Sequence, residues 1–259
     1  MSTNKTVLAL CAHPDDAEIR CSGTLFLLKA AGWDVHICTV STGDCGSAEL
    51  TPNEIAIIRR QEAKAAAAYL GAQYHCLGGQ DLRIFDDDYF RSKTVELIRI
   101  VRPDVVITHF PVDYMPDHTI TSELARMATF TASIRNYVTG PAAAVPPVSF
   151  IPALYYFGPL GGVDWLGNPI EPQFLVDVTS EIEKKAEMLA CHASQRDWLR
   201  IQHGMDQYIE EMKRADAEAG APVGMTFAEG FCMHKGHGYP QAPIIENALA
   251  GLVKQSPKK

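Results

Sequence analysis

The chain has 259 residues, of which 47% are hydrophobic and 21% are charged, so it is long enough to bury a sizeable core. Its net charge of -8 excludes the basic footprint of a nucleic-acid-binding protein. No apolar run approaches the roughly 20 residues that cross a bilayer, and the first apolar stretch lacks a signal-peptide cleavage site. We therefore expect a cytoplasmic protein without a nucleic-acid or membrane partner.

The first half of the chain alternates strand and helix patterns. The expected elements, in chain order, are a strand over 7–12, a helix over 15–31 closed by Gly32, a strand over 35–40, a helix from a Thr51/Glu54 capping box to Leu70, a helix over 92–101 and a strand over 105–108. Repeated strand-to-helix connections predict a parallel sheet with helices on both faces. Such a sheet carries its functional loops at the carboxyl ends of the strands.

The second half has weaker patterns. The expected elements are a Pro/Ala/Gly-rich loop over 137–152, strands over 153–157 and 174–178, a helix started by a capping box at Ser180 to Glu183, a helix over 198–219 and an irregular Gly/His/Pro-rich segment over 220–243. No internal boundary is evident. We therefore expect residues 1–259 to form one α/β domain with an irregular C-terminal segment from about residue 220.

Metal-binding side chains follow two of the predicted strands. His13 and Asp16 lie three residues apart at a strand-to-helix turn, where both can reach one ion. His118 lies at the start of a later helix and supplies a third ligand. Two His and one Asp leave a coordination position open, as in catalytic zinc sites, and Asp15 is then free to take a proton.

A purely structural interpretation remains open for the same residues. Asp15 or Asp16, and likewise Asp117, are good helix N-caps for backbone reasons alone. His109 at a strand end has the position of a hydrogen-bonded core histidine. The spacing by itself therefore leaves a metal site and a set of helix caps as alternatives.

Several motifs resemble those of the PIG-L/LmbE-like zinc deacetylases. They lie at residues 12–18 (AHPDDAE), 21–24, 42–47, 59–63, 68–71, 116–118, 176–178, 184–185 and 192–195, in the usual order of the family. The resemblance spans about residues 5 to 235. It implies a Rossmann-like α/β/α sandwich.

The resemblance also implies an activity and site residues. Members of the family remove an acetyl group from N-acetylglucosamine-containing molecules or cleave related amides in thiol-sugar metabolism, and they are often homo-oligomers. The residues it assigns are His13, Asp16 and His118 as ligands of Zn²⁺, with Fe²⁺ as the alternative metal, Asp15 as general base, Arg59 as a contact to substrate hydroxyls at the pocket rim, and Asp81 as an acidic sugar contact.

One position departs from the family pattern. Met115 stands where the family usually has a histidine that acts as acid or oxyanion stabiliser, and a thioether cannot donate a proton. The candidates to replace it are Tyr114, His109, Asp113, His234 and His237. Cys232, His234 and His237 also suggest a separate metal cluster by residue type. The rival interpretation is a zinc- or sugar-binding protein with little or no catalysis.

Overall fold

Strand β1, Thr6–Cys11, occupies the centre of the sheet because its side chains are apolar on both faces. In the computed structural model, which describes residues 4–140, 145–203 and 207–257, Val7 and Ala9 belong to one hydrophobic cluster, whereas Leu8 and Leu10 belong to another. This alternation is the period of two of a strand. It divides the core into two layers, one on each face of the sheet.

Eight strands form one mostly parallel sheet, as expected. The strands are β1, β2 Asp34–Ser41, β3 Gln73–Gly79, β4 Val105–His109, β5 Ala153–Phe157, β6 Phe174–Asp177, β7 Ala228–Met233 and β8 Val253–Gln255. Their order is β3-β2-β1-β4-β5-β7-β6-β8. The first five in that order are parallel, and β7, β6 and β8 are joined by antiparallel pairings.

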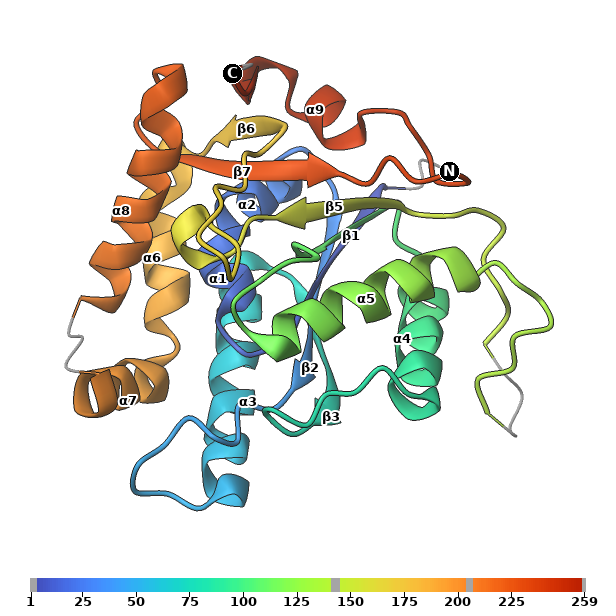
Figure 1. Cartoon of the computed structure of the whole chain (residues 1–259), viewed down its shortest axis with the longest axis horizontal. Helices are drawn as coiled ribbons and strands as arrows, with labels where there is room; N and C mark the ends of the chain where they lie inside the picture. Colours follow the sequence, from blue (N-terminus) through green and yellow to red (C-terminus); the bar gives the residue numbers. More distant parts are fainter. Residues whose placement is uncertain (1–3, 141–144, 204–206, 258–259) are drawn as a thin grey trace.

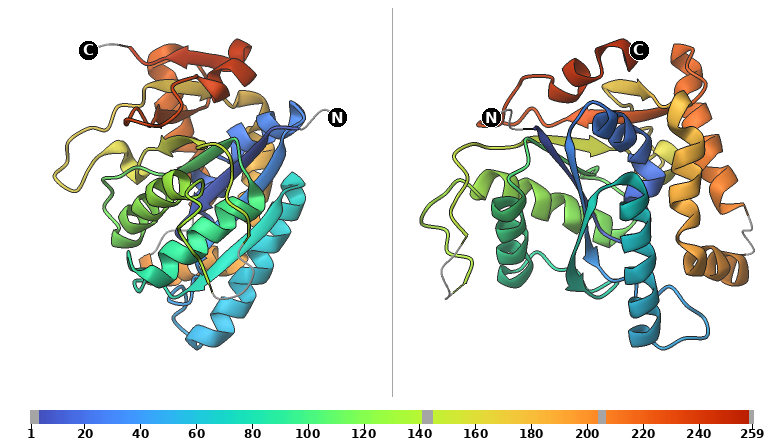
Figure 2. Two further views of the ribbon diagram at one scale, coloured as in Figure 1. Left: turned by 90° about the vertical axis from the view of Figure 1, so that its right-hand side faces the viewer. Right: turned by 180° about the vertical axis from the view of Figure 1, so that it is seen from behind.

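Helices cover both faces of this sheet (Figures 1 and 2). They are α1 Asp16–Arg20, α2 Ser22–Ala30, α3 Pro52–Leu70, α4 Asp88–Val101, α5 Pro116–Thr131, α6 Ile182–Ala190, α7 Ala193–His203, α8 Tyr208–Gly220 and α9 Ile244–Ala248. Helices α2, α3, α6 and α9 pack on one face, whereas α4 and α5 pack on the other. None of these helices has the length and apolar character that a bilayer-spanning helix requires.

The chain reverses its direction of winding between β1 and β4. From β1 it proceeds outward to β2 and β3, crosses back to β4 beside β1, and then continues to β5 on the other side. The carboxyl ends of two adjacent strands whose connections diverge leave a crevice, and ligands bind there in open α/β sheets. The predicted metal ligands follow these two strands.

The helix predicted over 15–31 is instead two helices, α1 and α2. The chain breaks at Cys21, where φ is -148°. The Glu229 carboxylate of β7 accepts hydrogen bonds from the N–H groups of Gly23 and Thr24, at 2.9 and 2.7 Å. A distant side chain thus satisfies the free N–H groups that start a new helix.

Other differences lie in the weakly patterned segments. The helix expected from residue 92 begins at Asp88, which Asp87 caps through the Phe90 N–H. The predicted capping box at Ser180 is wrong, because α6 begins at Ile182 without a side-chain cap. In place of the single helix expected over 198–219, the structure has the end of α7 and nearly all of α8. Residues 204–206 of that prediction lie outside the described ranges.

The segment expected to be irregular contains a central strand. β7 lies inside residues 220–243 and pairs with β5 and β6, and the edge strand β8 follows it. β3, which was not predicted, forms the opposite edge of the sheet. It ends at Gly79, where a Cβ would lie 2.9 Å from the Val40 carbonyl oxygen, so the two backbones require a glycine there.

Candidate metal centre and catalytic site

Three buried side chains with metal-binding atoms meet where β1 and β4 end. His13 follows β1, Asp16 begins α1, and His118 lies in the first turn of α5. One ligand atom of each lies within 4.8 Å of the others. Asp16 Oδ2 is 3.6 Å from His13 Nδ1, and Asp16 Oδ1 is 3.5 Å from His118 Nε2. Two imidazoles and a carboxylate fit zinc or another borderline divalent ion, so these residues form the candidate metal site.

The outer nitrogen of His13 has a carboxylate partner. His13 Nε2 lies 2.9 Å from Asp117 Oδ2, and the same oxygen accepts the Leu82 N–H at 2.7 Å. An imidazole that donates through Nε2 keeps the lone pair of Nδ1, which is the nitrogen that faces Asp16. Asp117, whose place in the sequence suggested a helix cap, therefore orients a candidate ligand.

His118 is held in the same way. His118 Nδ1 lies 3.0 Å from Asp113 Oδ1, and this oxygen also accepts the Met115 N–H at 3.0 Å. The proton on Nδ1 leaves the lone pair of Nε2 directed toward the candidate site. Asp113, predicted as a substitute for the family acid, instead has its Oδ1 engaged with a candidate ligand.

The electrostatics of the three residues favour a cation. Burial lowers the pKa of His13, but its hydrogen bonds with Asp117 and Asp16 outweigh this effect and raise that pKa to about 10. Burial also works to raise the pKa of Asp16, yet His118 holds it well below the usual range. An ionised carboxylate that stabilises positive charge beside it suits a divalent metal.

His109 lies beside the candidate site as a neutral histidine. Its ring stacks on His118 with centroids 4.0 Å apart, and its Nε2 accepts the Ala12 N–H at 3.0 Å. Burial, together with the charge of His118, lowers the pKa of His109 to about 4. With Nε2 engaged by the backbone, His109 supports the His118 ring from the β4 side.

Asp15, the predicted general base, is buried and directly precedes the candidate ligand Asp16. Its φ is 100°, a left-handed conformation that Asp tolerates better than most residues. Asp15 occupies the N-cap position of α1, but its side chain makes no cap hydrogen bond. Asp15 Oδ2 instead accepts the Tyr208 hydroxyl at 2.5 Å and lies 3.6 Å from Arg59 Nη2. Burial raises the pKa of Asp15, and Arg59 offsets part of that rise.

Arg59 and Asp81 hold the loop after β2. Arg59 is only 3% exposed and donates to the carbonyls of Pro14 and Gly43, and its contact to substrate hydroxyls stays a prediction. The Asp81 carboxylate accepts the Ser41 hydroxyl and the N–H groups of Gly43 and Cys45, at 2.8 to 3.0 Å. These contacts fix the backbone beside Asp15.

Tyr114 and Met115 border the site on the His118 side. The Tyr114 ring stands edge-on to His118 with centroids 5.7 Å apart, and 56% of Tyr114 is exposed. Met115 is the half-buried N-cap residue of α5. Of these two neighbours, only Tyr114 carries a proton donor.

His234 and His237 lie in a different place. They line a hollow of about 440 Å³ against the second half of α5, and Tyr156 Oη lies 2.8 Å from His234 Nδ1. Cys232 Sγ contacts the Glu171 carbonyl oxygen. Within the described ranges, the groups of three metal-type side chains do not include Cys232, His234 or His237, so the second cluster suggested by residue type does not form there.

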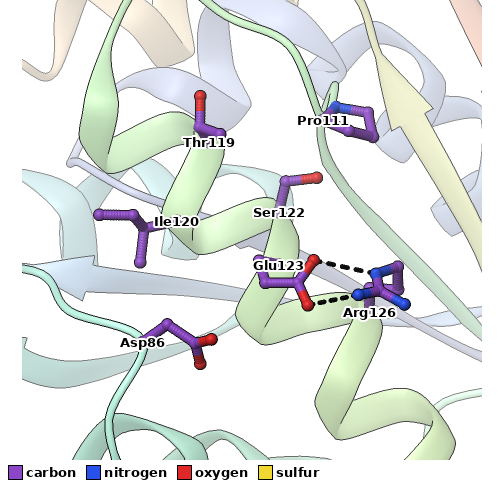
Figure 3. Close-up of a pocket in the computed structure, with 7 residues that line it drawn as sticks. All are labelled: Asp86, Pro111, Thr119, Ile120, Ser122, Glu123 and Arg126. Carbon is purple, nitrogen blue, oxygen red and sulfur yellow. Dashed lines mark hydrogen bonds and ion pairs between the residues drawn. The ribbon is translucent and has the colours of Figure 1, made fainter.

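A second hollow, of about 310 Å³, lies beside the first half of α5 (Figure 3). Its lining residues are Asp86, Pro111, Thr119, Ile120, Ser122, Glu123 and Arg126. Glu123 and Arg126 pair across one turn of the helix and line both hollows. Neither hollow is lined by His13, Asp16 or His118.

Comparison with known proteins finds a family match in the first half of the chain. The model of the PIG-L family, described as GlcNAc-PI de-N-acetylase, matches residues 8–129. The match covers a little under half of the chain. The matched residues include all three candidate ligands and Asp15, and the resemblance seen in the sequence motifs is thereby confirmed.

Relatives of this chain differ in their named reactions. A 4-oxalmesaconate hydratase of Pseudomonas putida KT2440 is 28% identical over 245 residues, which cover 90% of this chain and 88% of the relative. A 1D-myo-inositol 2-acetamido-2-deoxy-alpha-D-glucopyranoside deacetylase of Rhodococcus jostii RHA1 is 28% identical over 160 residues, covering 49% of this chain and 55% of that enzyme.

A solved structure confirms the fold. The N,N'-diacetylchitobiose deacetylase from Pyrococcus horikoshii superposes with a TM-score of 0.75 at 24% identity, over 93% of this chain and 88% of that one. The predicted α/β sandwich is therefore the fold of this chain. At this identity the likeness concerns the fold.

Proposed function

We propose that this PIG-L protein is a metal-dependent hydrolase that removes an acetyl group from the amide nitrogen of an N-acetylated amino sugar. The observation that carries the proposal is the buried Asp15 carboxylate beside the His13, Asp16 and His118 group. The PIG-L match over these residues supports the same reaction class. Amides of thiol-sugar conjugates are alternative substrates of the same chemistry.

The candidate ligands suit zinc best, with Fe²⁺ as the alternative. When bound, the metal supplies Lewis-acid chemistry, because it lowers the pKa of a bound water from about 15.7 toward about 7 and polarises a carbonyl. Asp15 takes the proton that water loses as it adds to the amide carbonyl. Tyr208 and Arg59 both contact Oδ2 of Asp15, so the proposed proton acceptor is Oδ1.

The departing nitrogen also needs a proton, and Met115 has none to give. We assign that step to Asp15, which returns the proton it received, so that acetate and a primary amine leave. The buried position of Asp15 supports this assignment, because burial raises its pKa toward the range in which it can hold a proton. The exposed hydroxyl of Tyr114 is the nearest alternative donor on the His118 side.

A hydratase is the second candidate. The hydratase of Pseudomonas putida matches nearly the full length of the chain, whereas the Rhodococcus deacetylase matches about half of it. Addition of water to a conjugated double bond needs a base for the water and a proton for the neighbouring carbon, and Asp15 would supply both in turn. No amine has to leave, so hydration does not require a histidine at the position of Met115 to protonate a leaving group.

The substitution Asp15→Asn tests the proposal. Asn tolerates the left-handed backbone of this position as Asp does, so the fold and the metal content should persist. We expect acetate release from N-acetylglucosamine derivatives in the zinc-loaded wild type and a loss of about 10²- to 10⁴-fold in kcat in the variant. Asp87→Asn, which keeps a helix cap on α4, is the matched control.

The outcomes separate the candidates. An Asp15→Asn protein that retains more than a tenth of the wild-type rate contradicts the assignment of the base. A wild type that releases no acetate but bleaches the ultraviolet absorbance of a conjugated keto acid is a hydratase. A wild type that holds stoichiometric zinc and is silent in both assays is a binding protein.

A further inference from the structure

Arg20 is a half-buried arginine without a partner among the described residues. It is the last residue of α1, one turn after Asp16. Its Nε is fully buried and has no hydrogen bond, and no described side chain or carbonyl pairs with the guanidinium. A buried N–H group without a protein acceptor needs water or a ligand as its partner. The guanidinium of Arg20 is therefore available to a molecule that enters the site.

The guanidinium lies on the His118 side of the candidate metal site. Arg20 Nη2 is 3.9 Å from the point where a Cβ on Gly158 would sit, and Gly158 directly follows β5. The preceding residue, Phe157, packs edge-on against His109. Partial burial raises the pKa of Tyr114 to about 12, and the nearby charge of Arg20 opposes that rise.

Arg20 differs from the other charged side chains near the candidate metal site in having no partner among the described residues. Asp15 and Asp16 are buried there, and Arg59 already pairs with Asp15. An anionic substrate approaching these carboxylates is repelled unless a cation receives its charged group. Arg20 has a free planar guanidinium, whose geometry matches a carboxylate or a phosphate through two parallel hydrogen bonds.

We propose that Arg20 binds an anionic group of the substrate, a carboxylate or a phosphate, between Gly158 and Tyr114. The proposal rests on the proposed function of the same site and adds the charge of the substrate to it. Either candidate reaction accommodates it, because the anionic group lies on a part of the substrate away from the reacting bond.

The experiment compares three acetylated sugars that differ in charge. Acetate release is measured with N-acetylglucosamine, with its 6-phosphate and with N-acetylmuramic acid, which carries a carboxylate. The zinc-loaded proteins are the wild type, Arg20→Gln, Arg20→Lys and, as matched control, Arg102→Gln. Arg102 is exposed just before the amino end of β4, whereas the candidate site lies at the carboxyl ends of β1 and β4.

We expect the wild type to prefer one anionic sugar to the neutral one by at least tenfold in kcat/KM. Arg20→Gln should lower that preference at least tenfold, and Arg20→Lys should restore part of it, because lysine keeps the charge but not the planar fork. The better of the two anionic sugars tells whether the group is a phosphate or a carboxylate. An unchanged preference in Arg20→Gln, or equal losses on all three sugars, would overturn the proposal.

A binding measurement separates this inference from the proposed function. Inorganic phosphate is titrated calorimetrically into the wild type and Arg20→Gln. Weaker binding to the variant by at least tenfold supports the anion site even if no acetate is released from any sugar, in which case the deacetylase proposal alone fails. Equal binding to both proteins, with Arg102→Gln as reference, means that Arg20 is merely solvated.

Discussion

The substitution Asp117→Asn should weaken metal binding without disturbing the geometry of the site. Both hydrogen bonds to Asp117, from His13 Nε2 and from the Leu82 N–H, end on the single oxygen Oδ2. An asparagine whose carbonyl oxygen takes that place accepts both bonds. The variant therefore removes the charge behind His13 and leaves the contacts in place.

The magnitude follows from the loss of that charge. A hydrogen bond to a charged acceptor contributes about 1.5–3 kcal/mol, and one between neutral groups about 0.5–1.5 kcal/mol. The difference of about 1–1.5 kcal/mol corresponds to a roughly tenfold weaker metal affinity. This lies at the lower end of the 10- to 100-fold losses that are typical when the carboxylate behind a metal-binding histidine is changed.

The assay is a zinc titration in competition with a chromophoric chelator. Asp113→Asn should give a similar loss, because Asp113 Oδ1 likewise accepts both His118 Nδ1 and the Met115 N–H. Asp87→Asn, remote from the histidines, should bind zinc as the wild type does. Wild-type affinity in Asp117→Asn would refute the assignment of Nδ1 as the metal-binding nitrogen of His13.

Two further predictions concern stability. Burial raises the pKa of Asp216 from 3.8 to about 6, although Lys185 works to lower it. Between about pH 4 and pH 6 the native state therefore keeps a proton that the unfolded chain has lost. As the pH rises through this range, the free energy of unfolding should fall by up to roughly 3 kcal/mol. Urea titrations should show a smaller fall in Asp216→Asn. Leu82 is 60% exposed with φ at 60°, so Leu82→Gly should raise the melting temperature through a gain of about 0.5–1 kcal/mol, whereas Leu50→Gly should not.

Local signals predicted some of the early elements correctly. The capping box at Thr51 forms as expected, with the Glu54 carboxylate accepting the Thr51 N–H at 2.9 Å, and the helix ends at Gly71 with φ at 75°. The apolar run of β1 was equally clear. These features depend on residues within one turn of one another, so their sequence signals needed no knowledge of the fold.

Elements that depend on distant contacts could not be predicted. The break between α1 and α2 requires Glu229, which lies more than 200 positions away. β7 carries Gly230 and is flanked by a Gly- and His-rich stretch, so its composition resembled a loop, and pairing with β5 and β6 on both sides stabilises it as a strand.

The candidate site was predictable only where it depends on residues that are close together in the sequence. The spacing of His13 and Asp16 is local, whereas the approach of His118 depends on β1 and β4 lying side by side. Tyr208 left no signal, because a tyrosine in an amphipathic helix is ordinarily a core residue. Its hydrogen bond with Asp15 spans 193 positions.

The PIG-L match ends at residue 129, yet residues beyond it surround Asp15, the proposed general base. Tyr208 of α8 donates to Asp15, and His192 pairs with the buried Glu18 of α1 at 3.0 Å. Lys185 and Glu229 form a buried ion pair that joins α6 to β7, and Glu229 also starts α2. The C-terminal part of the chain therefore holds the α1–α2 segment in place and sets the environment of Asp15. Since Met115 offers no proton, the proposed activity depends on that environment, and substitutions on α8 should alter turnover while metal affinity persists.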